Sequence, residues 1–290
     1  MENYQKTVMQ VSTVTLIGNI VLASFKILIG FITHSKAIIS DGIHSASDVL
    51  STIVVMIGVK LSSKDSDQEH PYGHERFECV AALILAIMLF ITALLIGYNG
   101  GLEILRPQTI KLQFAPMAII IAIISILVKE AMYWYTIIEA NRINCNAMKA
   151  DAWHHRSDAL SSIGSLIGVI GFSWGYYFFD ALASIVICGF IIKVAFDIFN
   201  DAINQMIDHA CNYEFQNEIR SLIMQQAGVQ QIDDLKTRLF GSKIYIDLEL
   251  QVDGNDSLIQ AHTIAHQVHD IIEKSYPMVK HCNIHVNPSD

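Results

Sequence analysis

The chain has 290 residues, of which 52% are hydrophobic and 16% are charged, and its formal net charge is −9. Its mean hydropathy of +0.39 lies well above that of an ordinary soluble domain. These values predict a membrane protein, and a negative charge without a Lys/Arg cluster argues against a nucleic-acid partner. The five cysteines have no CxxC spacing, which argues against a disulfide framework and against a thiolate metal site.

Six apolar segments are each long enough to cross a bilayer, which takes roughly 20 residues. They are residues 11–32, 38–62, 79–99, 114–137, 152–173 and 177–199. We expect the first segment to be a retained helix, because no small-residue cleavage site follows it. Lys and Arg are more frequent in the connections on the side of the two termini, so the positive-inside rule predicts cytoplasmic termini. Six spans without a targeting peptide fit a bacterial inner membrane, and an organelle stays open.

The second and fifth segments contain similar stretches. Residues 41–53 (DGIHSASDVLSTI) and 151–163 (DAWHHRSDALSSI) match at Asp, His, Ser, Asp, Leu, Ser and Ile. Six spans make these two segments antiparallel, as expected of an inverted repeat with a site at its interface. Convergence on one task also explains a match of this length, so duplication stays open.

Each similar stretch places a histidine and an aspartate on one face of a helix. His44 and Asp48 are four residues apart, and so are His154 and Asp158. Two imidazoles and two carboxylates suit a tetrahedral divalent cation, with zinc as the first candidate. An unpaired acid at the centre of a span costs on the order of 2.5–3.5 kcal/mol, which a bound cation offsets. The alternative is that these residues only bond between helices or reach water, and the repeated register disfavours it.

Other ionisable residues in the spans have less specific interpretations. Asp41 and Asp151 each precede a histidine by one turn, so they either begin a helix, face water or support the imidazoles. We expect Lys129, Glu130 and Asp180 to lie near the ends of the membrane spans. A channel is disfavoured, because the acids gather in two segments instead of forming a continuous polar path.

The connection after the second span contains a further group of potential ligands. Asp67, His70 and His74 surround a Pro-Tyr-Gly turn in SSKDSDQEHPYGHERFE. They either hold a second ion or are incidental residues of a polar loop. The segment HERFE lacks the second histidine of His-Glu-x-x-His, so a metalloprotease is not expected.

The composition becomes that of a soluble domain after residue 200, which divides the chain into residues 1–200 and 201–290. The second part has an α-β-β-α-β pattern that predicts a ferredoxin-like α+β fold. Its expected elements are a helix over 214–228, strands over 233–241 and 242–254, a helix over 257–276 and a strand over 281–288.

The paired His-x-x-x-Asp motifs, the loop HPYGHERFE and the tail motifs DDLKTR, QAH and NIHVNP together resemble the cation diffusion facilitator family. The resemblance extends over nearly the whole chain. It implies a homodimer, not an enzyme, that exports divalent metal from the cytoplasm in exchange for protons by alternating access. It also implies a six-helix transport domain and a cytoplasmic ferredoxin-like domain that supports dimerisation and binds metal.

The resemblance also assigns residues. It implies a transport site of His44, Asp48, His154 and Asp158 and a loop site of Asp67, His70 and His74. In the tail it implies that His262 and His285 are metal ligands, with Asp233 and Asp247 at positions that often hold histidine and Asn287 at one that often holds aspartate. The tail is therefore expected to bind one ion, to bind weakly, or to prefer a harder metal than zinc.

Members of the family that this chain resembles often have aspartate at the position of His44. The additional nitrogen ligand favours Zn²⁺ as the substrate, with Mn²⁺ and Fe²⁺ open. A membrane metalloenzyme is disfavoured, since four protein ligands leave little room for an activated water. The main alternative function is a membrane-bound metal sensor that binds without turnover.

Overall fold

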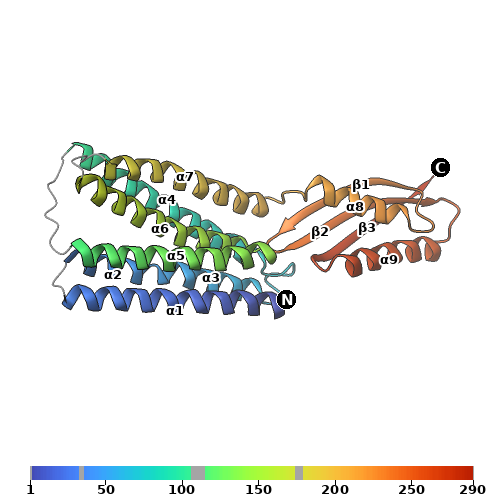
Figure 1. Cartoon of the computed structure of the whole chain (residues 1–290). Helices are drawn as coiled ribbons and strands as arrows, with labels where there is room; N and C mark the ends of the chain where they lie inside the picture. Colours follow the sequence, from blue (N-terminus) through green and yellow to red (C-terminus); the bar gives the residue numbers. More distant parts are fainter. Residues whose placement is uncertain (1, 33–35, 106–114, 174–178, 290) are drawn as a thin grey trace. The chain divides into compact units, whose positions relative to one another are not determined.

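The structure, a computed structural model, describes residues 2–32, 36–105, 115–173 and 179–289. The chain forms two compact units, Met1–Ala202 and Ile203–Asp290 (Figure 1). In the described residues of the first unit helices are the only regular secondary structure, and the second unit combines helices with a sheet. These two units confirm the predicted class, a helical membrane domain followed by an α+β domain.

The described part of the first unit is built of helices, most of them long and apolar. They are α1 (Glu2–Ile32), α2 (Lys36–Ser47), α3 (Val49–Ser62), α4 (Arg76–Leu105), α5 (Ala115–Arg142), α6 (Asn146–Ser173) and α7 (Phe179–Met206). Five segments of the described chain are long and apolar enough to cross a membrane: Tyr4–Ile32, Asp41–Ser62, Arg76–Leu102, Ile119–Arg142 and Leu182–Met206. The remaining long helix, α6, carries several charged residues that lower its hydropathy. The prediction of six spans therefore stays a prediction.

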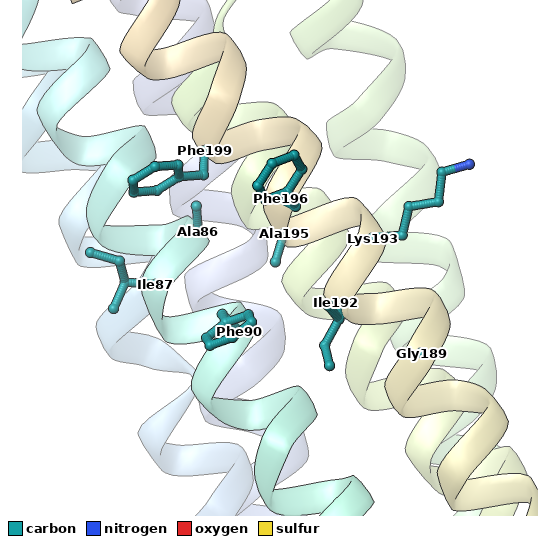
Figure 2. A pocket seen from close by; sticks show the side chains of 9 residues that line it. All are labelled: Ala86, Ile87, Phe90, Gly189, Ile192, Lys193, Ala195, Phe196 and Phe199. Carbon is teal, nitrogen blue, oxygen red and sulfur yellow. The ribbon is translucent and has the colours of Figure 1, made fainter.

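Large apolar side chains cover the outside of this unit. Leu28 of α1 and Phe196 of α7 are 60% and 65% exposed. A groove of about 460 Å³ between α4 and α7 is lined by apolar residues such as Phe90 and Ile192, and Figure 2 shows the nitrogen of Lys193 pointing away from the phenyl rings. Such surfaces are unfavourable in water and suit contact with hydrocarbon chains. No acid is among the described residues that line the groove, so it does not resemble a cation site.

The start of α6 is held by an acid from another helix. Glu78 of α4 accepts a hydrogen bond from the backbone N–H of Asn146 at 3.0 Å and one from the hydroxyl of Tyr4 at 2.6 Å. The first N–H groups of a helix have no partner within the helix, and its N-terminus carries partial positive charge. Glu78 meets both requirements and so fixes the beginning of the helix that carries His154 and Asp158.

Close packing between α3 and α4 depends on Gly58. A Cβ atom at position 58 would overlap the Cβ of Ala81, whereas one at Gly101 would have no neighbour within 4 Å among the described residues. Gly58→Ala is expected to destabilise the protein by about 1–3 kcal/mol, because the helices have to move apart. Gly101→Ala, the matched control, is expected to be neutral or stabilising, since alanine favours the helix. Thermal unfolding of both variants in one detergent tests this, and equal melting temperatures would contradict it.

The second unit is a three-stranded sheet with two helices. Its elements are α8 (Tyr213–Met224), β1 (Gln231–Phe240), β2 (Lys243–Asp253), α9 (Leu258–Ser275) and β3 (Val279–Ser289). The strand order is β1-β2-β3, antiparallel between β1 and β2 and parallel between β2 and β3. The predicted α-β-β-α-β order is thus confirmed.

The core of this unit follows from the alternation of β2. Ile246, Leu248 and Leu250 are buried, and they pack in one cluster with Ile223 of α8 and Ile272 of α9. The residues between them point to the opposite face of the sheet, because successive side chains of a strand alternate. On β2 this second face carries Asp247, Glu249 and Gln251, which are half-buried.

Candidate metal-binding site

The second predicted span is interrupted at one of its proposed ligands. Helix α2 ends at Ser47 and α3 begins at Val49, so Asp48 joins the two helices. Its backbone remains near-helical, with φ −64° and ψ −19°, and its N–H still donates to the carbonyl of His44 at 3.2 Å. His44 and Asp48 therefore keep their one-turn spacing on the same face across the interruption.

Two carboxylates from different helices converge on one ammonium group. The Nζ atom of Lys129 on α5 lies 2.6 Å from Oδ2 of Asp48 and 2.8 Å from Oδ2 of Asp158 on α6. The Nε2 atom of His154 lies 3.6 Å from Oδ1 of Asp48. Ligand atoms of His44, Asp48 and Asp158 all lie within 4.8 Å of one another. The structure thus brings the four predicted ligands together, and their assignment as a transport site stays a prediction.

The group is buried except at His44. Asp48 and Lys129 are each 3% exposed and Asp158 is 8% exposed, whereas His44 is an exposed residue. Buried charges of this kind are tolerated only when they are paired. One ammonium and two carboxylates leave a net charge of about −1 with the histidines neutral. The Oδ1 atom of Asp158 has no hydrogen-bond partner within the described chain, so its lone pairs are available to a cation.

The position of Lys129 corrects the sequence interpretation. It lies ten residues after the start and thirteen before the end of the apolar segment Ile119–Arg142, so the expectation that it lies near a membrane end is wrong. Glu130 instead pairs with Arg156 on α6 at 3.6 Å, and both are partly exposed. An ionisable residue in the middle of a span is by default a functional candidate with a partner nearby. That signal was present in the sequence.

The two acids one turn before the histidines have different surroundings. Asp151 is 1% exposed and accepts hydrogen bonds from the hydroxyls of Ser51 at 2.8 Å and Thr52 at 3.4 Å, both on α3. A helix-start or water-facing role is therefore wrong for Asp151, which links α6 to α3. Asp41 is half-exposed and pairs with Lys26 of α1 at 2.8 Å.

The loop after α3 brings its three predicted ligands together. His70 Nδ1 and His74 Nε2 lie 3.3 and 3.4 Å from the two carboxylate oxygens of Asp67. Asp67 also accepts the backbone N–H of His70 at 2.8 Å, which holds the turn. The Lys64 ammonium, 2.8 Å away, and this backbone N–H hold the pKa of Asp67 below its usual range. The carboxylate is thus ionised at neutral pH, and binding of an ion here stays a prediction.

The four tail residues expected to bind metal lie on different elements: Asp233 on β1, Asp247 on β2, His262 on α9 and His285 on β3. Asp233 accepts amide N–H groups from Gln251 and Asn287, each at 2.8 Å. Within the described residues of one chain, no three potential ligand atoms that include one of these four residues lie close enough together to hold an ion. Their role as ligands stays a prediction.

Comparison with known proteins covers both units. The sequence profile of the cation efflux transmembrane domain matches residues 12–207, and that of the cation efflux protein cytoplasmic domain matches residues 211–289. An uncharacterized transporter of Methanocaldococcus jannaschii is 37% identical over 276 residues, which cover 95% of this chain and 96% of the relative. The manganese efflux system protein MneP of Bacillus subtilis is 31% identical over 286 residues, covering 96% and 95%.

A plant relative extends the comparison. Metal tolerance protein C1 of Arabidopsis thaliana is 33% identical over 287 residues, which cover 94% of this chain and 61% of that protein. The two profiles together account for most of the chain, and the relatives align along nearly all of it. The chain therefore belongs to the cation efflux family, also called cation diffusion facilitators, whose members are membrane transporters of divalent metal cations and not enzymes.

Proposed function

We propose that the protein exports Zn²⁺ from the cytoplasm in exchange for protons, by alternating access, and that His44, Asp48, His154 and Asp158 bind the transported ion. The observation that carries this proposal is the ammonium of Lys129, held between two buried carboxylates at 2.6 and 2.8 Å. It marks a point within the helices where the protein stabilises a cation.

A divalent ion entering this group takes the place of the Lys129 ammonium. Zinc needs ligands at about 2.0–2.2 Å, and both carboxylates already point to one centre. Two further ligand atoms are nearby. One is Oδ1 of Asp158, which has no hydrogen-bond partner in the described chain, and the other is a nitrogen of the His154 imidazole. The metal brings twice the charge of the ammonium, so it gains more from the same two carboxylates. When the ion leaves, Lys129 returns and compensates one of the two negative charges.

The choice of zinc rests on the imidazoles. Nitrogen ligands suit zinc, whereas manganese prefers carboxylate, carbonyl and water oxygens. The relative MneP is a manganese efflux system protein, which keeps Mn²⁺ as the second candidate substrate. Fe²⁺ is the third, because it also accepts imidazole and carboxylate ligands.

Proton exchange provides the driving force in this proposal. Moving a divalent ion out of a cell with an inside-negative potential costs about 2.3 kcal/mol per charge per 100 mV. A metal-bound imidazole has to be neutral, so a proton and a metal ion compete for the same nitrogen atom of His44 or His154. Protons that enter from the outside then bind the two histidines and release the metal on the outer side of the membrane.

The organisation of the chain fits this activity. We place residues 1–200 in the inner membrane of a bacterial cell as the transport domain, with both termini in the cytoplasm. Residues 201–290 form the cytoplasmic domain that joins two chains into a homodimer and binds metal, as the match to the family's cytoplasmic domain supports. Ligands from the second chain would complete a site with His262 and His285. The loop group of Asp67, His70 and His74 takes a further ion.

Proton flux in liposomes tests the exchange. Purified protein is reconstituted with a pH-sensitive dye inside, and zinc, manganese and iron(II) are added separately outside. We expect a proton flux opposite to metal movement, largest for zinc, and none in protein-free liposomes. Metal movement without a proton flux would contradict antiport, and a larger response to manganese would contradict the choice of zinc.

A further inference from the structure

A group of three potential metal ligands lies in the second unit. None of the three was assigned a role from the sequence. His269 and Glu273 are one turn apart on α9, and His281 lies near the start of β3. The Nε2 atom of His269 is 3.3 Å from Oε1 of Glu273, and Nδ1 of His281 is 3.5 Å from the same oxygen. The three ligand atoms all lie within 4.8 Å of one another.

One histidine is held in the orientation and tautomer that metal binding needs. The Nδ1 atom of His269 lies 2.8 Å from the backbone carbonyl of Cys282. A carbonyl only accepts hydrogen bonds, so Nδ1 carries the proton and the neutral ring has its lone pair on Nε2, the atom that faces Glu273. Metal-binding histidines commonly donate their other N–H to a backbone carbonyl in this way.

The carboxylate is held by the same strand residue. The backbone N–H of Cys282 donates to Oε1 of Glu273 at 3.3 Å. Cys282 itself is buried in the core of the unit, at 2% exposure. One residue of β3 therefore positions two side chains of α9, and His281 is the more exposed third member of the group.

The distances from the Glu273 carboxylate to the two histidines fit a tetrahedral ion. Ligands at about 2.0–2.1 Å from a tetrahedral zinc lie about 3.3–3.4 Å from each other. The distances from Glu273 Oε1 to the two imidazole nitrogens, 3.3 and 3.5 Å, match this edge. The side chain of His281 is 58% exposed and the other two are about half as exposed, at 29% and 32%, so an ion reaches the group from solvent.

We propose that His269, Glu273 and His281 bind one Zn²⁺ ion per chain, with water in the fourth position. Two nitrogens and one oxygen favour zinc over manganese. The bound ion joins the last turns of α9 to the beginning of β3 and stabilises that part of the unit, because binding only to the folded form shifts the equilibrium towards it. This site goes beyond transport: it responds to zinc without requiring the ion to enter the membrane.

Hydrogen exchange of the full-length protein tests the proposal locally. The protein is held in lipid nanodiscs, and amide exchange of residues 265–284 is followed with and without added ZnCl₂. We expect zinc to slow exchange there at least severalfold, and MnCl₂ at the same concentration to do so much less. Equal protection with either metal, or none with zinc, would overturn the site.

Matched variants separate this group from other histidines. His281→Ala and Glu273→Gln are expected to abolish the zinc effect on residues 265–284 and to remove one bound zinc per chain. His266→Ala, an exposed neighbour on α9, and His285→Ala are expected to keep it. Loss of the effect in His285→Ala, or its persistence in both His281→Ala and Glu273→Gln, would contradict the assignment. Asp158→Asn should leave the effect intact, which keeps this test independent of transport.

Discussion

Asp158→Asn is expected to reduce metal transport to the level of protein-free liposomes. The substitution keeps the size of the side chain and removes one of the two carboxylates that hold the Lys129 ammonium. A divalent ion then loses a charged ligand. The empty protein is also destabilised by about 1–3 kcal/mol, because a buried ammonium loses a charged partner. Isotope flux in liposomes and thermal unfolding in detergent measure the two effects.

A double variant distinguishes lost chemistry from lost folding. Lys129→Met combined with Asp158→Asn removes a positive and a negative charge together, so the buried group keeps its net charge. The melting temperature is expected to recover relative to Asp158→Asn alone, since replacing a buried ion pair by groups of similar volume is often neutral. Transport is expected to remain absent. Recovery of transport in the double variant would show that Asp158 serves only to balance Lys129.

Lys129→Met alone is expected to tighten metal binding by about tenfold or more, a change of about 1.4 kcal/mol. Methionine retains the length of the side chain but removes the cation that metal has to displace. Without metal, Asp48 and Asp158 face each other uncompensated, which destabilises the empty protein by about 3–5 kcal/mol. Added metal should restore stability. Net transport is expected to slow, because release of a more tightly held ion becomes limiting.

The stability of Lys129→Met is measured by thermal unfolding at increasing zinc concentration, and its zinc affinity is measured by calorimetric titration. Lys193→Met serves as the matched control, since it removes the same charge from a span at the apolar groove of α4 and α7 (Figure 2), whose described lining residues include neither Asp48 nor Asp158. It should leave zinc affinity unchanged. Weaker binding in Lys129→Met would contradict displacement and would instead make Lys129 a support for the two carboxylates.

Structural features that depend on only one or two segments of the chain could be predicted from periodicity and residue spacing. The four-residue spacing of His44 and Asp48 survives the interruption at Asp48, because the N–H of Asp48 still bonds one turn back. The order of elements in the tail followed from alternation in β2 and from helical repeats, and the capping box of Ser257 and Gln260 begins α9 one residue inside the predicted range. Local hydrogen bonding and one buried face decide these features.

What the sequence did not predict depends on which helices become neighbours. Lys129 has no counterpart in the repeated stretches, and its role appears only because α5 lies beside α6, opposite Asp48. The sequence suggested that Asp151 begins a helix or faces water. The hydrogen bonds that it accepts from Ser51 and Thr52 of α3 are visible only in the structure. Contacts between segments far apart in sequence are not encoded in the pattern of any one of them.

Counting the ions delivered per protomer tests the central claim most directly. Liposomes containing a known amount of protein and an internal metal-sensitive dye receive zinc outside, with Asp158→Asn liposomes beside them. If the protein transports metal through the buried acid pair, the lumen accumulates many ions per protomer, and the variant delivers none above background. Uptake that stops at one or a few ions per protomer, or equal uptake by the variant, would contradict the account and favour a sensor that only binds.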